Sequence, residues 1–192
     1  MNEEILDKQI IIIDSNEGFF SDNNKYDFYI DIYTPIKDAC LIKILESSLI
    51  VTDLYKDANE PTDKGKLNGN EILNNDNIYI NVNNYNRIIT TNKTNHSSSS
   101  YFDLITVDRT KYIQEYFVKA SNQASVVTID YNIKNDHVTD DASFIINPID
   151  PSLKRFNIIL YDKNNTILNK TNTKRFIMKL CIYHNRKKLT HG

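Results

Sequence analysis

The chain has 192 residues, 28 of them isoleucine and 26 asparagine, with only 4 glycines, 4 prolines and a formal net charge of −2. This length predicts one sizeable domain, and the isoleucine and asparagine content favours strands joined by turns. The charge lacks the basic footprint of a protein that binds nucleic-acid phosphates, and no apolar run is long enough for a membrane-spanning helix.

The first predicted strand is the isoleucine run Ile10, Ile11, Ile12 and Ile13, for which the sequence allows two roles. Four consecutive isoleucines present apolar side chains on both faces of a strand. The ordinary explanation is a first strand buried between core and loops. The alternative is an arm that adds to the sheet edge of a neighbouring molecule. Loss of folding when residues 1–13 are removed would indicate the core strand, and a folded protein that fails to assemble would indicate the arm.

An Asp14-Ser15 turn follows, and alternating hydrophobicity then predicts a strand at residues 26–33. One face carries Tyr26, Phe28, Ile30 and Ile32, and the other carries Asp27, Tyr29, Asp31 and Tyr33. This is the pattern of a half-buried strand, which we expect to end at Pro35. At residues 40–51 apolar side chains fall on both faces, which predicts a strand inside the core.

Strands and polar loops alternate through the middle of the chain. We predict a long polar loop at residues 57–77 and a low-complexity loop at 92–100, because neither segment has apolar side chains to bury. Strands are predicted at residues 78–83, 87–91, 101–107, 110–120, 126–133 and 143–146. The segment 110–120 also has helical spacing, but its aromatic and β-branched content favours a strand. A turn is expected at Pro148 and Pro151.

The C-terminal third predicts a hairpin and a last strand. Residues 155–161 lead into a turn at 162–165, and the chain returns through Ile167 and Leu168. Residues 174–183 form the last predicted strand, with alternate apolar residues on one face. Eight or more strands without a convincing amphipathic helix predict an all-β fold, an antiparallel two-sheet jelly-roll β-sandwich. We expect a single domain over residues 1–192, with short flexible termini at about 1–9 and 185–192.

No catalytic, metal or cofactor site is predicted. The four histidines show no ligand spacing with each other or with Cys40 and Cys181, so we expect neither an enzyme nor a disulfide framework. The acidic N-terminal residues give no secretory signal. A carboxylate cluster surrounds His137, and oxygen ligands of this kind bind Ca²⁺, but the cluster lacks a ligand pattern and a solvated acidic turn is favoured. Its members are Asp130, Asp136, Asp140 and Asp141.

Surface features suggest contacts with other proteins. Outward-facing tyrosines such as Tyr29 and Tyr33 suit interfaces, as they suit any exposed β-surface. The basic run Arg186, Lys187 and Lys188 is suited to an acidic patch of a neighbouring subunit or to an internal membrane, although a frayed charged terminus is the simpler explanation.

Two segments of the chain resemble the jelly-roll minor capsid proteins of nucleocytoplasmic large DNA viruses. In the first, the apolar run ends in Asp14 and Ser15 and is followed by an alternating strand, a Pro35-Ile36 turn and a strand leading to Tyr55. The second is RFNIILYDKNNTIL followed by KRFIMKLCIY. The sequence departs from the family at Asn16 and Glu17, where many relatives have an arginine, and at Asn164 and Asn165, where glycine is usual.

The resemblance implies a structural component of an icosahedral viral capsid. Because a major capsid protein of this group needs two jelly rolls and 192 residues hold one, it implies a minor capsid protein, a penton subunit or a cement protein. The implied partners are the major capsid protein, neighbouring minor capsid proteins, further copies of the chain (a pentamer for a penton) and an internal viral membrane. The implied location is the virion, assembled in the host cytoplasm. The alternative is a non-viral β-sandwich module that binds carbohydrate or Ca²⁺. The candidate contact residues are Ile10, Ile11, Ile12, Ile13, Asp14, Ser15, Tyr29, Tyr33, Arg186, Lys187 and Lys188.

Overall fold

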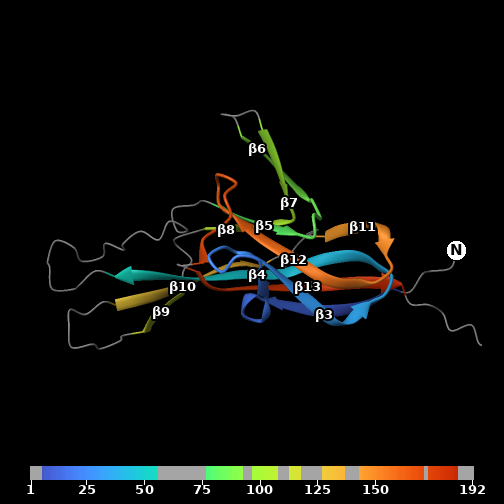
Figure 1. The fold of residues 1–192 in the computed structure, drawn as a ribbon, viewed down its shortest axis with the longest axis horizontal. Coiled ribbons are helices and arrows are strands. Elements are labelled where there is room, and N and C mark those ends of the chain that lie inside the picture. Colours follow the sequence, from blue (N-terminus) through green and yellow to red (C-terminus); the bar gives the residue numbers. More distant parts are fainter. Residues whose placement is uncertain are drawn as a thin grey trace, which may run out of the picture.

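A computed structural model of the chain describes residues 6–55, 77–92, 97–107, 113–117, 127–136, 143–170 and 173–185. Nearly all of these residues lie in strands or tight turns (Figure 1). The elements are β1 (Leu6–Asp14), the 3-10 turn η1 (Ser15–Glu17), β2 (Phe19–Phe20), β3 (Asp27–Ile36), β4 (Ala39–Tyr55), β5 (Asn77–Val82), β6 (Ile88–Asn92), β7 (Ser97–Tyr101), β8 (Asp103–Thr106), β9 (Ile113–Phe117), β10 (Val127–Asp136), β11 (Ser143–Asp150), β12 (Leu153–Tyr161) and β13 (Thr173–Asn185). No helix in the described ranges is long and apolar enough to cross a membrane.

Two antiparallel sheets pack on each other and enclose the core. One has the strand order β1-β13-β4-β10-β9, with β11 also paired to β4, and the other has the order β2-β3-β12-β5-β8. Eight of these strands, taken in chain order, are β1, β3, β4, β5, β8, β10, β12 and β13. If these strands are numbered from 1 to 8 along the chain, the first sheet has the spatial order 1-8-3-6. The second sheet has the spatial order 2-7-4-5. This is the order of a jelly roll, so the predicted fold class is confirmed.

Strand β4 lies in the middle of the first sheet, as its apolar pattern predicts. It pairs with β13 along one edge and with β10 and β11 along the other. The core lies between the two sheets, and its members from β4 and β13 are fully buried. Phe176 of β13 meets Phe28 of β3 across the sandwich, with ring centroids 6.4 Å apart in an edge-on arrangement. Such contacts between side chains of opposite sheets hold the layers together.

Two prolines lie inside strands, which corrects the predicted strand ends. Strand β3 continues through Pro35 to Ile36, and β11 continues through Pro148, so that only Pro151 lies in the turn. The ladder between β3 and β12 has an irregularity beside Pro35, and the ladder between β11 and β4 has one beside Pro148. A proline without an N–H is tolerated there because no regular ladder bond is required of it.

Residues 97–100, predicted as part of a loop, form strand β7 instead. This strand pairs with β6 over five residues, and the two make a ribbon that projects from the sandwich in Figure 1. The backbone N–H of Arg87 donates to the carbonyl of Tyr101 at the base of the ribbon (2.8 Å). The prediction failed because it looked for an apolar face, and a two-stranded ribbon forms backbone bonds without one. The strands predicted at 87–91, 110–120 and 126–133 are confirmed as β6, β9 and β10.

The predicted turn after β12 is present, but the returning segment forms no strand. Asp162 Oδ1 accepts the N–H groups of Asn164 and Thr166, both at 2.8 Å, and Asn165 has a positive φ of 62°. The return then makes two isolated bridges, Ile167 with Tyr161 and Asn169 with Lys25, and the Leu168 N–H donates to the carbonyl of Leu160 (2.9 Å). On β12 the return is limited to Leu160 and Tyr161, because β3 pairs with the strand as far as Ile159 and β5 pairs along the other edge.

Several expectations lie outside the described residues. They concern most of the polar loop at 57–77, residues 1–5 and 186–192 of the two termini, and part of the carboxylate cluster near His137. Residues 6–9, expected to belong to a flexible terminus, are part of β1.

We expect Phe176→Ala to reduce the free energy of unfolding by about 3–5 kcal/mol, because it empties a ring-sized volume at the contact between the sheets. Urea unfolding of the two proteins measures the change. Ile10→Ala is the matched control, since this side chain is half exposed and its truncation should change stability by about 0.5 kcal/mol or less. A loss below about 1 kcal/mol for Phe176→Ala would contradict the assignment of this ring to the core.

Candidate protein-protein interface

Strand β1 is an edge strand in which Ile11 and Ile13 pack in the core and the isoleucines that alternate with them are exposed to solvent. Its whole length pairs with β13 without a register shift, from Leu6 opposite Asn185 to Asp14 opposite Ile177. Ile13 is fully buried and Ile11 packs against the core. Ile10 and Ile12 alternate with them and are 53% and 65% exposed. The core role therefore holds for Ile11 and Ile13, and the arm that pairs with a neighbouring molecule stays a prediction.

Among the described residues, no strand pairs with the outer edge of β1. Edge strands usually carry prolines, bulges or charges that prevent further pairing. Strand β11, which pairs with β4 alone, contains Pro148 and an irregular ladder. The central part of β1, residues 9–13, has none of these features. It is a regular, uncharged and mainly apolar edge that is flanked by Lys8 and Asp14.

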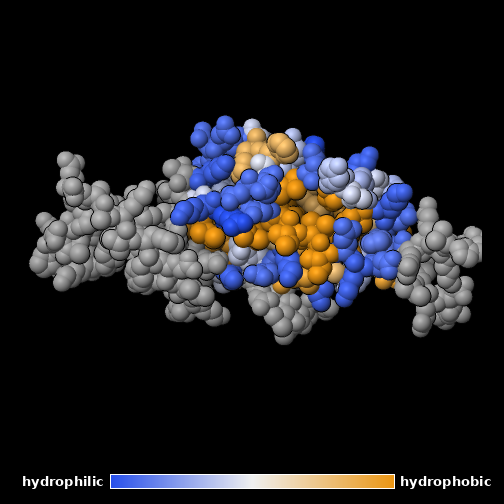
Figure 2. Space-filling model, turned by 90° about the horizontal axis from the view of Figure 1, so that it is seen from below, coloured by the Kyte–Doolittle hydropathy of each residue, from blue (hydrophilic) through white to orange (hydrophobic). Residues whose placement is uncertain are grey.

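The molecular surface beside the outer edge of β1 is apolar. β1, drawn in the darkest blue, runs along the lower side of the sandwich in Figure 1. Figure 2 views the molecule from below and shows a broad hydrophobic area bordered by hydrophilic residues. Among the exposed large hydrophobic side chains of the described ranges, Leu6, Ile10 and Ile12 belong to β1. Contiguous apolar surface of this kind marks sites of protein contact.

The predicted contact residues Asp14 and Ser15 tie the end of β1 to β13. The Asp14 carboxylate forms a two-pronged ion pair with Arg175, in which Nε lies 3.0 Å from Oδ1 and Nη2 bonds Oδ2. It also accepts the Asn16 N–H (3.0 Å) and so caps η1. The buried Ser15 accepts the backbone N–H of Phe176 at its Oγ (2.9 Å). These contacts are intramolecular, and an interface role for either residue stays a prediction.

The ion pair sets the protonation of Asp14. The hydrogen bond from Arg175 holds the pKa of the Asp14 carboxyl below its usual value of 3.8, against the opposing effect of burial. The same contact raises the pKa of Arg175. The carboxylate therefore stays charged throughout the neutral range, where it stabilises the junction between β1, η1 and β13.

The two predicted tyrosines lie on the outer face of β3 in different surroundings. Tyr29 stacks on Phe19 with ring centroids 5.2 Å apart, and the guanidinium of Arg155 lies 3.9 Å from its ring centre. Tyr33 is fully exposed. The basic run Arg186, Lys187 and Lys188 lies outside the described residues.

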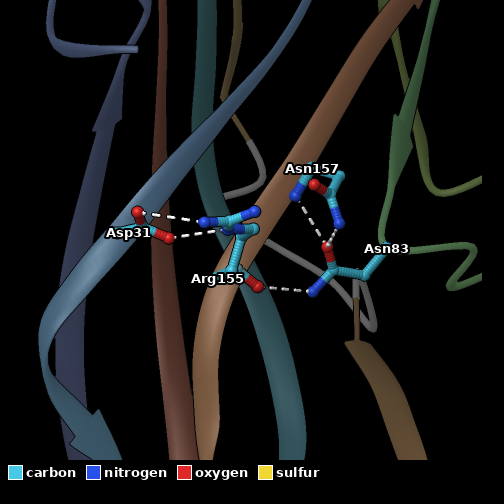
Figure 3. A network of polar contacts seen from close by, with 4 residues as sticks. All are labelled: Asp31, Asn83, Arg155 and Asn157. Carbon is cyan, nitrogen blue, oxygen red and sulfur yellow. Dashed lines mark hydrogen bonds and ion pairs between the residues drawn. The ribbon is translucent and has the colours of Figure 1, made fainter. Parts of the chain in front are cut away.

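A polar network that sequence reasoning missed lies on the same face (Figure 3). Arg155 makes two bonds to Asp31, at 2.6 and 3.1 Å. Asn83 donates its amide to the carbonyl of Arg155 (2.9 Å) and accepts the backbone N–H of Asn157 (2.7 Å). The alternation of β3 places Asp31 outward in the sequence pattern, but only the register between β3 and β12 sets Arg155 opposite it.

A second unpredicted cluster joins the two sheets. Asp103 of β8 is 1% exposed, and its carboxylate bonds the guanidinium of Arg87 (3.1 Å) and the hydroxyl of Ser47 on β4 (3.4 Å). Arg87 also donates from Nε to the carbonyl of Phe102 (3.1 Å). A buried carboxylate needs such partners, and here they fix the base of the β6-β7 ribbon to the sandwich.

Within the described part of the chain, no group of three or more histidine, cysteine or acidic residues could hold a metal ion. Of the carboxylate cluster near His137, Asp140 and Asp141 lie outside that part. In the described residues Cys40 and Cys181 form no disulfide, and Cys181 is buried on β13 opposite Ile10.

Comparison with known proteins adds a likeness in structure. No family model matches the sequence. No curated protein matches it either. Among solved structures, the penton protein of mavirus aligns with 93% of this chain and all of its own, at 9% sequence identity and a TM-score of 0.41. The fold assignment rests on the strand order described above and does not depend on this likeness.

We expect Asp14→Ala to lower the free energy of unfolding by about 1–2 kcal/mol at pH 7, because it removes the cap of η1.

Asp14→Asn keeps a capping group but removes the charge, so its loss of unfolding free energy relative to the natural chain should depend on pH. The folded pKa of Asp14 lies below 3.8, so the stabilisation by the ion pair is present above that value and is lost as the pH falls through the folded pKa. Unfolding curves from pH 7 to the acid limit measure this. A deficit of Asp14→Asn that stays constant on acidification would contradict the role of the charge.

Proposed function

We propose that the chain is a structural subunit of an icosahedral viral capsid, in the class of minor capsid, penton or cement proteins, and that it acts through protein-protein contacts. The observation that carries the proposal is β1, a regular hydrophobic edge strand on a jelly roll. Such an edge is an aggregation hazard for a protein that works alone, whereas an assembly covers it with a neighbour. Jelly rolls are a common architecture of viral capsid domains.

The residues that resemble minor capsid proteins support the proposal by their place in the fold. The N-terminal segment supplies β1, β3 and β4, and the C-terminal segment supplies β12 and β13. These segments lie far apart in the sequence and adjacent in the sheets, where β13 runs between β1 and β4, and β12 runs beside β3. The resemblance therefore covers the part of the sandwich that includes the exposed edge.

The proposed partners are other capsid proteins, namely the major capsid protein, neighbouring minor capsid proteins and further copies of this chain. The proposed location is the virion. Under this proposal the basic run Arg186, Lys187 and Lys188 contacts an acidic patch of a neighbour or the internal membrane.

A second candidate function, a carbohydrate-binding module, is favoured by the outer face of β3 and β12. Lectin domains also use jelly rolls. The face combines the exposed ring of Phe19 with the fixed amides of Asn83 and Asn157 and the charged pair of Arg155 and Asp31. Aromatic rings beside a few oriented polar groups are typical of small-molecule sites. A screen for glycans that raise the melting temperature of the chain tests this candidate, because a ligand that binds only the folded protein stabilises it.

We expect Ile10→Asp/Ile12→Asp to reduce incorporation of the chain into particles at least tenfold, because two buried charges in a strand contact cost far more than the roughly 1.4 kcal/mol that a tenfold change requires. Quantitative mass spectrometry of purified particles, made with the variant in place of the natural chain, measures incorporation. Ile145→Asp is the matched control, since Ile145 is also exposed (70%) but lies on β11. Absence of the natural chain from the particles would overturn the capsid proposal, and equal incorporation of the double variant would overturn the role of β1.

A further inference from the structure

We infer that the outer edge of β1 binds the same edge of a second copy, antiparallel, so that one sheet continues across a two-fold axis with Ile11 opposite Ile11. The inference deepens the proposed capsid function, because it names the partner and the register of the contact that β1 makes.

The two-fold axis limits the registers that are available. In a continuous sheet, residues directly opposite each other point their side chains to the same face. The outward row of β1 contains the exposed Lys8, Ile10 and Ile12 and the partly buried Asp14, and these side chains must meet the outward row of the second copy. Only registers that pair even-numbered residues with even-numbered residues satisfy this condition.

One of these registers is complementary in both charge and hydrophobicity. With Ile11 on the axis, Lys8 lies opposite Asp14 and Ile10 lies opposite Ile12, and each pair occurs twice. The outward row then consists of two apolar pairs flanked by two pairs of opposite charge. Cross-strand apolar and opposite-charge pairs are both stabilising. The carboxylate of Asp14 already bonds Arg175, and the strand contact brings a second cation toward it.

The neighbouring registers lose this match. With Ile10 on the axis, Lys8 faces Ile12 and Leu6 faces Asp14, so every charge meets an apolar side chain. With Ile12 on the axis, Ile10 faces Asp14 and Lys8 has no partner within residues 6–14. The sequence of β1 therefore selects the register centred on Ile11.

The interface made by this strand alone is small. Seven residues from each copy, 8–14, enter the contact, which is below the size of a standard stable interface. We therefore expect a dimer that dissociates on dilution. In a shell the two copies are held close together by their other contacts, which raises the effective concentration for this pairing.

Charge placement on the full-length chain tests the register. Ile10→Glu and Ile12→Lys, made separately, each place a charge opposite an isoleucine and should weaken the dimer at least tenfold by sedimentation velocity across a wide concentration range. The double variant Ile10→Glu/Ile12→Lys should recover the dimer, because each glutamate then lies opposite a lysine. In the register centred on residue 10, two glutamates would meet on the axis, and in that centred on residue 12, two lysines would meet.

A second variant leaves the isoleucines unchanged. Lys8→Glu places like charges opposite each other at both ends of the contact and should also weaken the dimer, whereas Lys154→Glu, an exposed lysine on β12, should not. Thermal melts establish that every variant is folded. A natural chain that is monomeric at all concentrations, or a double variant no stronger than the single ones, overturns the inference.

The same variants separate this inference from the capsid proposal. If the natural chain dimerises with the predicted charge pattern but is absent from purified particles, the strand pairing stands and the capsid role fails. If the natural chain is monomeric in solution and Ile10→Glu abolishes incorporation into particles, β1 contacts a different capsid protein. In that case the self-pairing fails and the capsid role stands.

Discussion

The structure depends on the pairing of β13 with β4, because this pair joins the end of the chain to its beginning at the centre of one sheet. The ladder runs from Thr173 opposite Val51 to His184 opposite Ala39 and contains three register shifts. Its inner face supplies fully buried side chains to the core, Phe176, Met178, Leu180 and Ile182 from β13 among them. Because β13 also pairs with β1, the last strand lies between the first strand of the jelly roll and the third, which is β4.

The position of β13 also explains why β1 is exposed. β13 uses one edge for β4 and the other for β1, so β1 becomes the outermost strand of its sheet in the described part of the chain. The corner at Asp14, held by Arg175, fixes the end of β1 to β13 without covering its outer edge. The same arrangement that completes the core therefore presents a regular apolar edge, which is the surface on which the proposed assembly depends.

Prediction from the sequence was accurate where apolar and polar side chains alternate along a strand. It failed where backbone hydrogen bonds alone set the end or the presence of a strand. The outward and inward rows of residues 26–33 were predicted correctly, because a strand alternates with a period of two. Strand ends were predicted poorly at Pro35 and Pro148, where irregular ladders tolerate a missing N–H. The serines of β7 carry no apolar signal, and only their pairing with β6 makes them a strand.

The sequence by itself determined that the chain is all-β, which residues share a strand face, and that Ile10 to Ile13 divide into two alternating rows. It did not determine which row faces water, because the four side chains are identical and only the pairing with β13 and the opposing sheet distinguish them. The tertiary structure also decided the partners of Asp14 and Asp103, which are Arg175 for the first and Arg87 and Ser47 for the second. Ion pairs between distant segments depend on strand register, and register is set by the packing of the whole sandwich.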